Sequence, residues 1–213
     1  MEHGRMDNSI TLHGQVCRTA QVSHCNHEQT FYVFPLAVCR LSGVRDTLNV
    51  LVSQQGLEGR LPQQGDEVTV AGEVRSFNNR SGQGSRLVIT VLARQLRWEQ
   101  GEDENNLTLT GTLCKPPIYR RTPLGRDISD LMLAVNRRYG RSDYLPCIAW
   151  GSLAQRCAAL PVGAQLTLEG RLQSRTYTKR LEDREEERTA FEVSVMHMQT
   201  ERGQPEAVKC DRE

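Results

Sequence analysis

The chain has 213 residues and a mass of 24.1 kDa; 38% of its residues are hydrophobic and 25% are charged. Its 27 basic and 26 acidic side chains leave a formal net charge of +1, which alone points to no polyanionic partner. No apolar run approaches the length of a membrane span, and the N-terminal stretch MEHGRMDNSI has no apolar signal core. We therefore expect a cytoplasmic protein whose seven cysteines are reduced, and not a membrane or secreted protein.

The first half of the chain is predicted to be a series of strands. Apolar and polar residues alternate with a period of two over five segments, residues 10–16, 31–38, 48–52, 68–74 and 87–91. Gly72 stands in the middle of the fourth segment, which indicates a sharp bend where a barrel turns its corner. A short helix fits between the third and fourth segments.

An acidic segment, residues 98–104, separates this half from a repeat of it. NNLTLTGTLC, starting at Asn105, repeats NSITLHGQVC, starting at Asn8, at an offset of 97 positions. GAQLTLEGRLQS repeats GDEVTVAGEVRS at an offset of 98 positions. A register held over this length predicts two copies of one domain, residues 8–97 and 105–200, with a polar tail over residues 201–213.

The second copy repeats the strand pattern at residues 107–113, 131–135, 145–150, 166–172 and 191–195. Between its third and fourth strands, we expect Ser152 and Gln155 to form the N-cap and N3 pair of a capping box, and Pro161 to stop the helix. Gly170 repeats the mid-strand position of Gly72. Five strands with one short helix between the third and fourth describe an OB-fold barrel. The predicted fold is therefore all-β, with two tandem five-stranded Greek-key OB-fold barrels.

The segment DYLPCIAWGSLA, which starts at Asp143, carries large side chains where a core does not need them. Strand alternation places Tyr144, Pro146, Ile148 and Trp150 on one face and the smaller Leu145, Cys147 and Ala149 on the other. The smaller set suits a narrow barrel interior, so we expect the larger set to lie outside. An outward aromatic at a strand end is a platform for an unpaired base, because every base has a π-face.

Copy two resembles the bacterial single-stranded DNA-binding proteins over nearly its whole length. The segments that carry the resemblance are NNLTLTGTLCKPP, DLMLAVNRRYG, DYLPCIAWGSLA and LTLEGRLQSRTY. The resemblance implies base-stacking roles for Tyr139, Tyr144, Trp150 and Tyr177. Taken singly, each of the four is better interpreted as an ordinary half-buried strand aromatic. Taken together, at positions that match the family's motif, the four favour stacking. Copy one resembles a diverged member of the family, and its NSITLHGQVCRTA is also similar to the start of primosomal replication protein N.

Cations surround the candidate aromatics. Copy two has 14 basic against 10 acidic side chains, and copy one has 9 against 6. Phosphate contacts and stacked rings together are what a single strand needs, although any one arginine also fits a solvated surface. The basic candidates are Arg120, Arg121, Arg137, Arg138, Arg175 and Lys179. In copy one we expect Phe77 to stack, and Phe31, Tyr32 and Phe34 to pack in the barrel or an interface.

These observations predict a non-catalytic protein that binds single-stranded DNA with little sequence preference, in replication, recombination or repair. No cofactor is expected, and Cys17, His24, Cys25 and His27 have no common zinc-finger spacing, so no metal site is predicted. The resemblance implies four barrels, and hence a homodimer with the first strands or the barrel faces paired; a self-sufficient pseudo-dimer formed by one chain is the alternative. Replication or recombination partners are also expected, although the C-terminus lacks the family's acidic tip. A primosome-like accessory factor and an OB-fold scaffold for protein interactions remain alternative functions.

Overall fold

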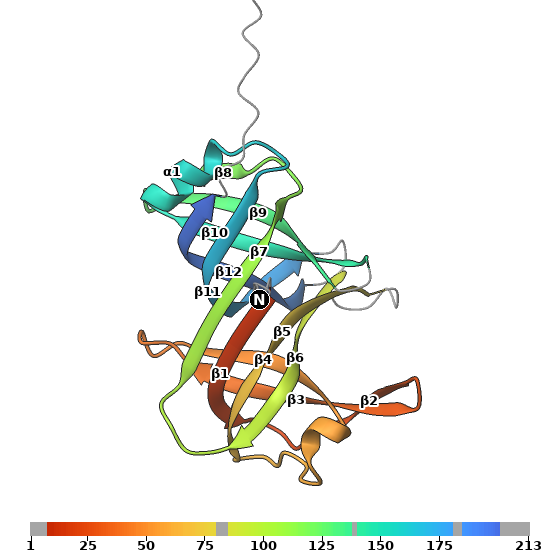
Figure 1. Cartoon of the computed structure of the whole chain (residues 1–213). Helices are drawn as coiled ribbons and strands as arrows, with labels where there is room; N and C mark the ends of the chain where they lie inside the picture. The colour runs from red at the N-terminus through yellow and green to blue at the C-terminus, as the bar shows by residue number, and fades with distance from the viewer. Residues whose placement is uncertain (1–7, 80–84, 138–139, 181–184, 201–213) are drawn as a thin grey trace, which may run out of the picture.

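A computed structural model describes residues 8–79, 85–137, 140–180 and 185–200, and nearly all of its regular structure is β-strand (Figure 1). The first half contains β1 (Asn8–Val16), β2 (Gln21–Asn26), β3 (Gln29–Cys39), β4 (Arg45–Ser53), the 3-10 helix η1 (Gln55–Leu57), β5 (Glu67–Asn78) and β6 (Leu87–Trp98). The second half contains β7 (Glu104–Leu113), β8 (Ile118–Arg121), β9 (Asp127–Asn136), β10 (Ser142–Trp150), α1 (Ser152–Ala158), β11 (Gln165–Arg180) and β12 (Glu185–Thr200).

The strand order shows that the two halves have the same topology. The strands pair in the order β2-β3-β4-β6-β5-β1-β7-β11-β12-β10-β9-β8, so each half of the list mirrors the other. Further pairings of β3 with β1 and of β9 with β7 close each half into a barrel. We call β1–β6 barrel 1 and β7–β12 barrel 2. The predicted pair of tandem OB-fold barrels is confirmed.

The two barrels are joined through their first strands. β1 and β7 run antiparallel, with Asn8 opposite Leu109 and His13 opposite Glu104. Figure 1 shows β1 and β7 side by side at the centre of the molecule, with barrel 2 on one side and barrel 1 on the other. The inter-strand hydrogen bonds therefore continue from one barrel into the other, and neither first strand is left as a free edge.

Two mid-strand glycines make the predicted barrel corners. The pairing register of β5 with β6 shifts at Gly72, and that of β11 with β12 shifts at Gly170, as in a β-bulge. A Cβ atom on Gly72 would lie 2.2 Å from the carbonyl oxygen of Leu92, and one on Gly170 would lie 2.1 Å from that of Ser194. Only glycine permits this close approach of two backbones.

Three local features differ from the sequence prediction. The short strands β2 and β8, which were not predicted, add a hairpin strand to each barrel. The capping-box prediction is wrong, because Gly151 is the N-cap and Ser152 is already helical. The amide of Gln155 donates to Asp127 of β9 instead, over 2.7 Å. Finally, the helix of barrel 1 is only the 3-10 turn η1.

A duplicated polar cluster holds the barrels together beside the β1–β7 pair. The buried Asp143 of β10 accepts hydrogen bonds from Arg137 and from the backbone N–H of Ser76 on β5, the latter over 2.5 Å. Arg137 also donates to the carbonyl oxygen of Ser76 over 2.9 Å. We call Asp143, Arg137 and Ser76 the first clasp.

The second clasp consists of Asp46, Arg40 and Ser174, with the roles of the two barrels exchanged. The buried Asp46 of β4 accepts hydrogen bonds from Arg40 and from the backbone N–H of Ser174 on β11, the latter over 2.7 Å. Arg40 donates to the carbonyl oxygen of Ser174 over 3.3 Å. The contact between the barrels is therefore self-complementary, as in a two-fold dimer interface, although one chain forms it.

Candidate nucleic-acid interface

The alternation predicted for β10 is present in the structure. Leu145, Cys147 and Ala149 point into barrel 2 and are buried, whereas Tyr144 is 49% exposed and Trp150 is 40% exposed. Ile148, on the same face as these aromatics, is the exception, because it is buried. The two rings thus stand at the two ends of one strand, on the outer face of the barrel. The hydrophobic core does not require them there.

The neighbours of Trp150 on this face come from the adjoining strands. Trp150 lies opposite Ile128 of β9, which lies opposite Arg120 of β8. Cross-strand partners point to the same side of a sheet, so Arg120 shares the face of Trp150. Arg120 forms an exposed ion pair with Asp130, with its Nε 2.8 Å from the carboxylate. Its cation is exposed, but its charge is partly compensated.

A second row crosses barrel 2 in the same direction and extends this face to β11. It runs Ile118, Asp130, Ile148, Ser194 and Arg171, one residue from each of five strands. On β11, Arg175 and Tyr177 have the same alternation as Arg171 and therefore point to the same side. The guanidinium of Arg175 lies over the ring of Tyr177, 5.6 Å from its centroid. We use the term outer face of barrel 2 for the side that carries Arg120, Tyr144, Trp150, Arg171, Arg175 and Tyr177.

The outer face continues onto barrel 1 at its Tyr144 end. The backbone N–H of Tyr144 donates to the hydroxyl of Ser76 over 2.8 Å. The next residue, Phe77, is 43% exposed, and the guanidinium of Arg137 lies 5.4 Å from its ring centroid. The predicted residues Tyr144, Arg137 and Phe77 therefore come together where the two barrels meet.

The other predicted residues lie in different positions. Arg121 is opposite Asp127 on β9 and forms an ion pair with it, so it has the opposite alternation from Arg120. Arg137 is mostly covered, because it belongs to the first clasp. Lys179 lies in β11, two residues beyond Tyr177. Arg138 and Tyr139 lie outside the residues that the structure describes.

Sequence reasoning missed two residues of the outer face. Ile118 is 64% exposed at the start of β8. Arg171 has a buried Nε without a hydrogen-bond partner in the part of the chain that the structure describes. The signal for Ile118 was available, because IYRR and RDIS flank the turn residues TPLG, a hairpin pattern. Nothing local distinguishes Arg171 from other strand arginines.

Tyr119 and Asp127 fix the β8–β9 hairpin on its other side. Hydrogen bonds from the Gln155 amide and the Tyr119 hydroxyl lower the pKa of the Asp127 carboxyl below its ordinary value. Because Gln155 belongs to α1, this cluster ties the hairpin to the helix. The hairpin that carries Arg120 is thereby tied to α1, the helix that follows Trp150 in the chain.

Barrel 1 differs on the corresponding face. The β4 residues at the positions of Tyr144 and Trp150 are Thr47 and Ser53, so β4 has no aromatic platform. Phe34 is buried in the core and Tyr32 packs against it, as expected. Phe31 does not pack in the barrel: it alternates with Tyr32, points outward, and stacks on His24. Its expected alternative place, an interface, stays a prediction.

No metal site emerges among the residues that the structure describes. No group of three or more histidine, cysteine, aspartate or glutamate side chains there could hold a metal ion. Cys25 contacts the hydroxyl of Thr30, with 3.5 Å between the two atoms. The six cysteines within the described ranges are all free thiols. In the same ranges, no helix is long and apolar enough to cross a membrane.

Comparison with known proteins finds matches to single-stranded DNA-binding proteins. The model of the single-strand binding protein family matches residues 104–200, which are barrel 2. The chain is 32% identical to the single-stranded DNA-binding protein of Halalkalibacterium halodurans over 99 residues, which are 43% of this chain and 56% of that protein. It is 35% identical to single-stranded DNA-binding protein A of Bacillus subtilis over 80 residues, 34% of this chain and 46% of that protein.

The chain thus spans about half the length of the curated relatives it matches. The crystal structure of the wild-type single-stranded DNA-binding protein from Thermus aquaticus matches both barrels. Its TM-score is 0.75 at 23% sequence identity, covering 94% of this chain and 96% of that one. At this identity the likeness establishes the fold of the two barrels.

Proposed function

We propose that the chain binds single-stranded DNA without catalysis and with little sequence preference. The observation that carries the proposal is the pair of exposed rings, Trp150 and Tyr144, at the two ends of β10 on a barrel that the model of the single-strand binding protein family matches. An unpaired base stacks on such a ring whatever its identity, and nearby arginines contact the phosphates. The names of the relatives in Halalkalibacterium halodurans and Bacillus subtilis support the same function.

In this proposal the strand follows the outer face of barrel 2. Bases stack on Trp150 and Tyr144 of β10 and on Tyr177 of β11, and Arg120 and Arg175 contact phosphates. Arg121 has the opposite alternation, and Arg138 and Tyr139 lie outside the described residues. Roles for these three residues and for Lys179 of β11 in DNA binding stay predictions of the sequence. The strand then crosses to barrel 1 between Tyr144 and Phe77, where Ser76 joins the barrels. The protein would hold exposed strands during replication, recombination or repair in the cytoplasm.

Binding of a labelled oligonucleotide tests the proposal. The parent protein should bind a single strand far more tightly than a duplex of the same length, because duplex bases are not available for stacking. The logarithm of the binding constant should fall linearly with the logarithm of the salt concentration, with a slope of about −0.7 for each phosphate contacted. Equal affinity for the duplex would reject the proposal and favour an accessory or scaffold role.

We also propose a division of the chain and an assembly. Residues 8–97 and 105–200 would be two domains joined by residues 98–104, since β6 ends at Trp98 and β7 begins at Glu104. Two chains would combine to give four barrels, using surfaces other than β1 and β7, which already pair within one chain. Light scattering should then give twice the 24.1 kDa mass of one chain. A mass of one chain at working concentration would reject the homodimer.

A further inference from the structure

Barrel 1 carries a pair of stacked rings that the proposed function does not use. His24 of β2 lies opposite Phe31 of β3, and the two rings are nearly parallel, with centroids 5.0 Å apart and an interplanar angle of 6°. Every residue of β2 is exposed, and Phe31 is half-buried. The β2–β3 hairpin projects from the side of barrel 1 (Figure 1). The pair therefore forms a flat surface that is open to solvent on the imidazole side.

The internal repeat relates this pair to the outer face of barrel 2. Phe31 lies opposite Ser53 of β4, as Ile128 lies opposite Trp150 of β10. At an offset of 97 positions, Phe31 corresponds to Ile128 and Ser53 to Trp150. Both barrels therefore place one large ring in the same cross-strand row. In barrel 2 the ring is on β10, whereas in barrel 1 it is one strand over, on β3.

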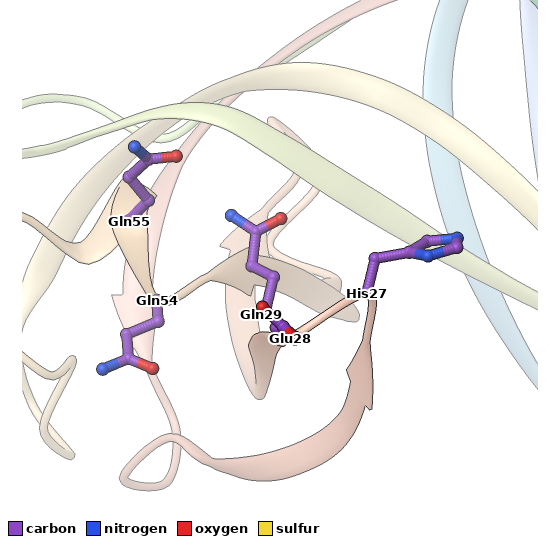
Figure 2. A pocket seen from close by; sticks show the side chains of 5 residues that line it. All are labelled: His27, Glu28, Gln29, Gln54 and Gln55. Carbon is purple, nitrogen blue, oxygen red and sulfur yellow. The ribbon is translucent and has the colours of Figure 1, made fainter.

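A hollow lined by amides adjoins the ring pair. It is open, and His27, Glu28, Gln29, Gln54 and Gln55 line it. Figure 2 shows the amides of Gln29 and Gln55 pointing to the same side, while the Gln54 amide points the opposite way and the imidazole of His27 points away from all three. Gln29 lies two residues before Phe31 on β3 and so points to the same face. Each amide can both donate and accept hydrogen bonds, as the edges of bases require.

We propose that His24 and Phe31, with the adjoining amides, form a second nucleic-acid-binding site that stacks an unpaired base on barrel 1. This inference rests on the proposed function, because the base would belong to the strand held by barrel 2. The hairpin sequence QVSHCNHEQTF contains no lysine or arginine and has one glutamate. The site therefore contributes stacking and base-edge contacts with few phosphate contacts. It should raise affinity without steepening the salt dependence.

The test compares two lengths of oligothymidylate. One OB-fold barrel occupies about 4–16 nucleotides, so a strand of about 8 nucleotides reaches one barrel and one of about 35 reaches both. The double variant His24→Ala, Phe31→Leu removes the ring pair but keeps an apolar side chain on β3. We expect it to bind the long strand about tenfold more weakly, with an unchanged salt slope and unchanged affinity for the short strand. Val22→Ala, the control, shortens an exposed side chain of the same hairpin outside the ring pair and the hollow, and should behave like the parent protein.

The outcomes distinguish failure of the second site on barrel 1 from failure of the proposed function. If the double variant binds the long strand as tightly as the parent does, the second site is rejected while the function of barrel 2 stands. If the parent binds neither strand and Trp150 fluorescence does not change, the proposed function itself fails. Should the double variant unfold, the parent can be photocrosslinked to a long strand that carries 5-iododeoxyuridine. An adduct on the peptide with His24 or Phe31 supports the site, and adducts confined to barrel 2 reject it.

Discussion

The two tryptophans of the chain have different environments. Trp150 ends β10 and projects from the outer face of barrel 2. Trp98 ends β6 and packs against the core, and the guanidinium of Arg60 lies 5.0 Å from its ring centroid. One face of the Trp98 ring is therefore covered by a cation and another part by the core. Only Trp150 is positioned to accept a base.

This contrast leads to a prediction for Trp150→Ala. Loss of one stacked base should weaken binding of a single strand by about 1–3 kcal/mol, and most of the DNA-induced fluorescence change should disappear. The barrel should stay folded, because the ring is outside the core. Fluorescence titration and thermal unfolding measure the two effects. Trp98→Phe is the control and should keep both affinity and quenching. If Trp150→Ala unfolds barrel 2, the ring is a core residue and the stacking proposal is wrong.

Two arginines, Arg137 and Arg175, show that the hydrogen-bond partner of a side chain cannot always be predicted from the sequence. Arg137 and Arg175 both lie close to aromatic residues in the sequence, so both were predicted to contact DNA. Arg137 is instead paired with the buried Asp143, whereas Arg175 is exposed over Tyr177. The pairing of Arg137 depends on Ser76 of the other barrel, which is 61 positions away. No local pattern contains that contact.

At the scale of elements, the sequence predicts what repeats and alternates. The long strands, the buried set on β10 and the bends at Gly72 and Gly170 were predicted, because each follows from period-two alternation or from a mid-strand glycine. β2 and β8 were not, since they are short and exposed and bury too few side chains to alternate. The capping-box prediction is wrong because the side chain of Gln155 donates its hydrogen bond to Asp127 of β9, a residue of another element. A local sequence pattern does not show that a residue distant in the sequence will provide the hydrogen-bond partner.

The close backbone approach at the bulge glycines leads to a prediction about the stability of the protein. Gly170→Ala should lower the free energy of unfolding by about 1–3 kcal/mol or more, because the new Cβ would meet the backbone at Ser194, which cannot move aside as a side chain can. Gly56→Ala is the control, since its Cβ would meet only side-chain atoms of Val52 and Ser53, at 3.2 and 3.4 Å. Urea unfolding followed by circular dichroism compares the two. Equal stability of Gly170→Ala and the parent contradicts the close approach.

At the scale of the whole molecule, one chain forms what two identical subunits would form. The strand order is symmetric about the β1–β7 pair, and the two clasps exchange the roles of the barrels. The repeat offset of 97 positions predicted two copies of one domain, but it could not predict how they dock. Docking depends on Asp46 and Asp143, which are only two of 26 acidic residues in the sequence. Their burial became evident only in the structure.

The ionisation of the clasp carboxylates links this docking to pH. Burial by itself would raise the pKa of Asp143, but hydrogen bonds from Arg137, the Ser76 backbone and Arg75 hold it below its ordinary value. Arg40 and Ser174 lower the pKa of Asp46 in the same way, against the same effect of burial. A carboxyl whose pKa is depressed in the folded state stabilises it fully above the unfolded pKa of about 3.9. That stability is lost as the pH falls through the folded pKa.

Asp143→Asn should therefore destabilise the molecule at neutral pH and change its response to acid. Removing the carboxylate leaves the mostly covered Arg137 without its anion, whereas Arg75 keeps its ion pair with Glu73; breaking such a buried pair costs about 3–5 kcal/mol. Asp130→Asn, in the exposed pair with Arg120, should cost at most about 1 kcal/mol. Urea unfolding at pH 7 and at pH 3 measures both variants. The difference between Asp143→Asn and the parent should shrink at pH 3, because this pH lies below the unfolded pKa of about 3.9 and the carboxyl of the unfolded parent is then mostly protonated. If Asp143→Asn is no less stable than Asp130→Asn at pH 7, the clasp does not hold the barrels together, and the β1–β7 ladder alone does.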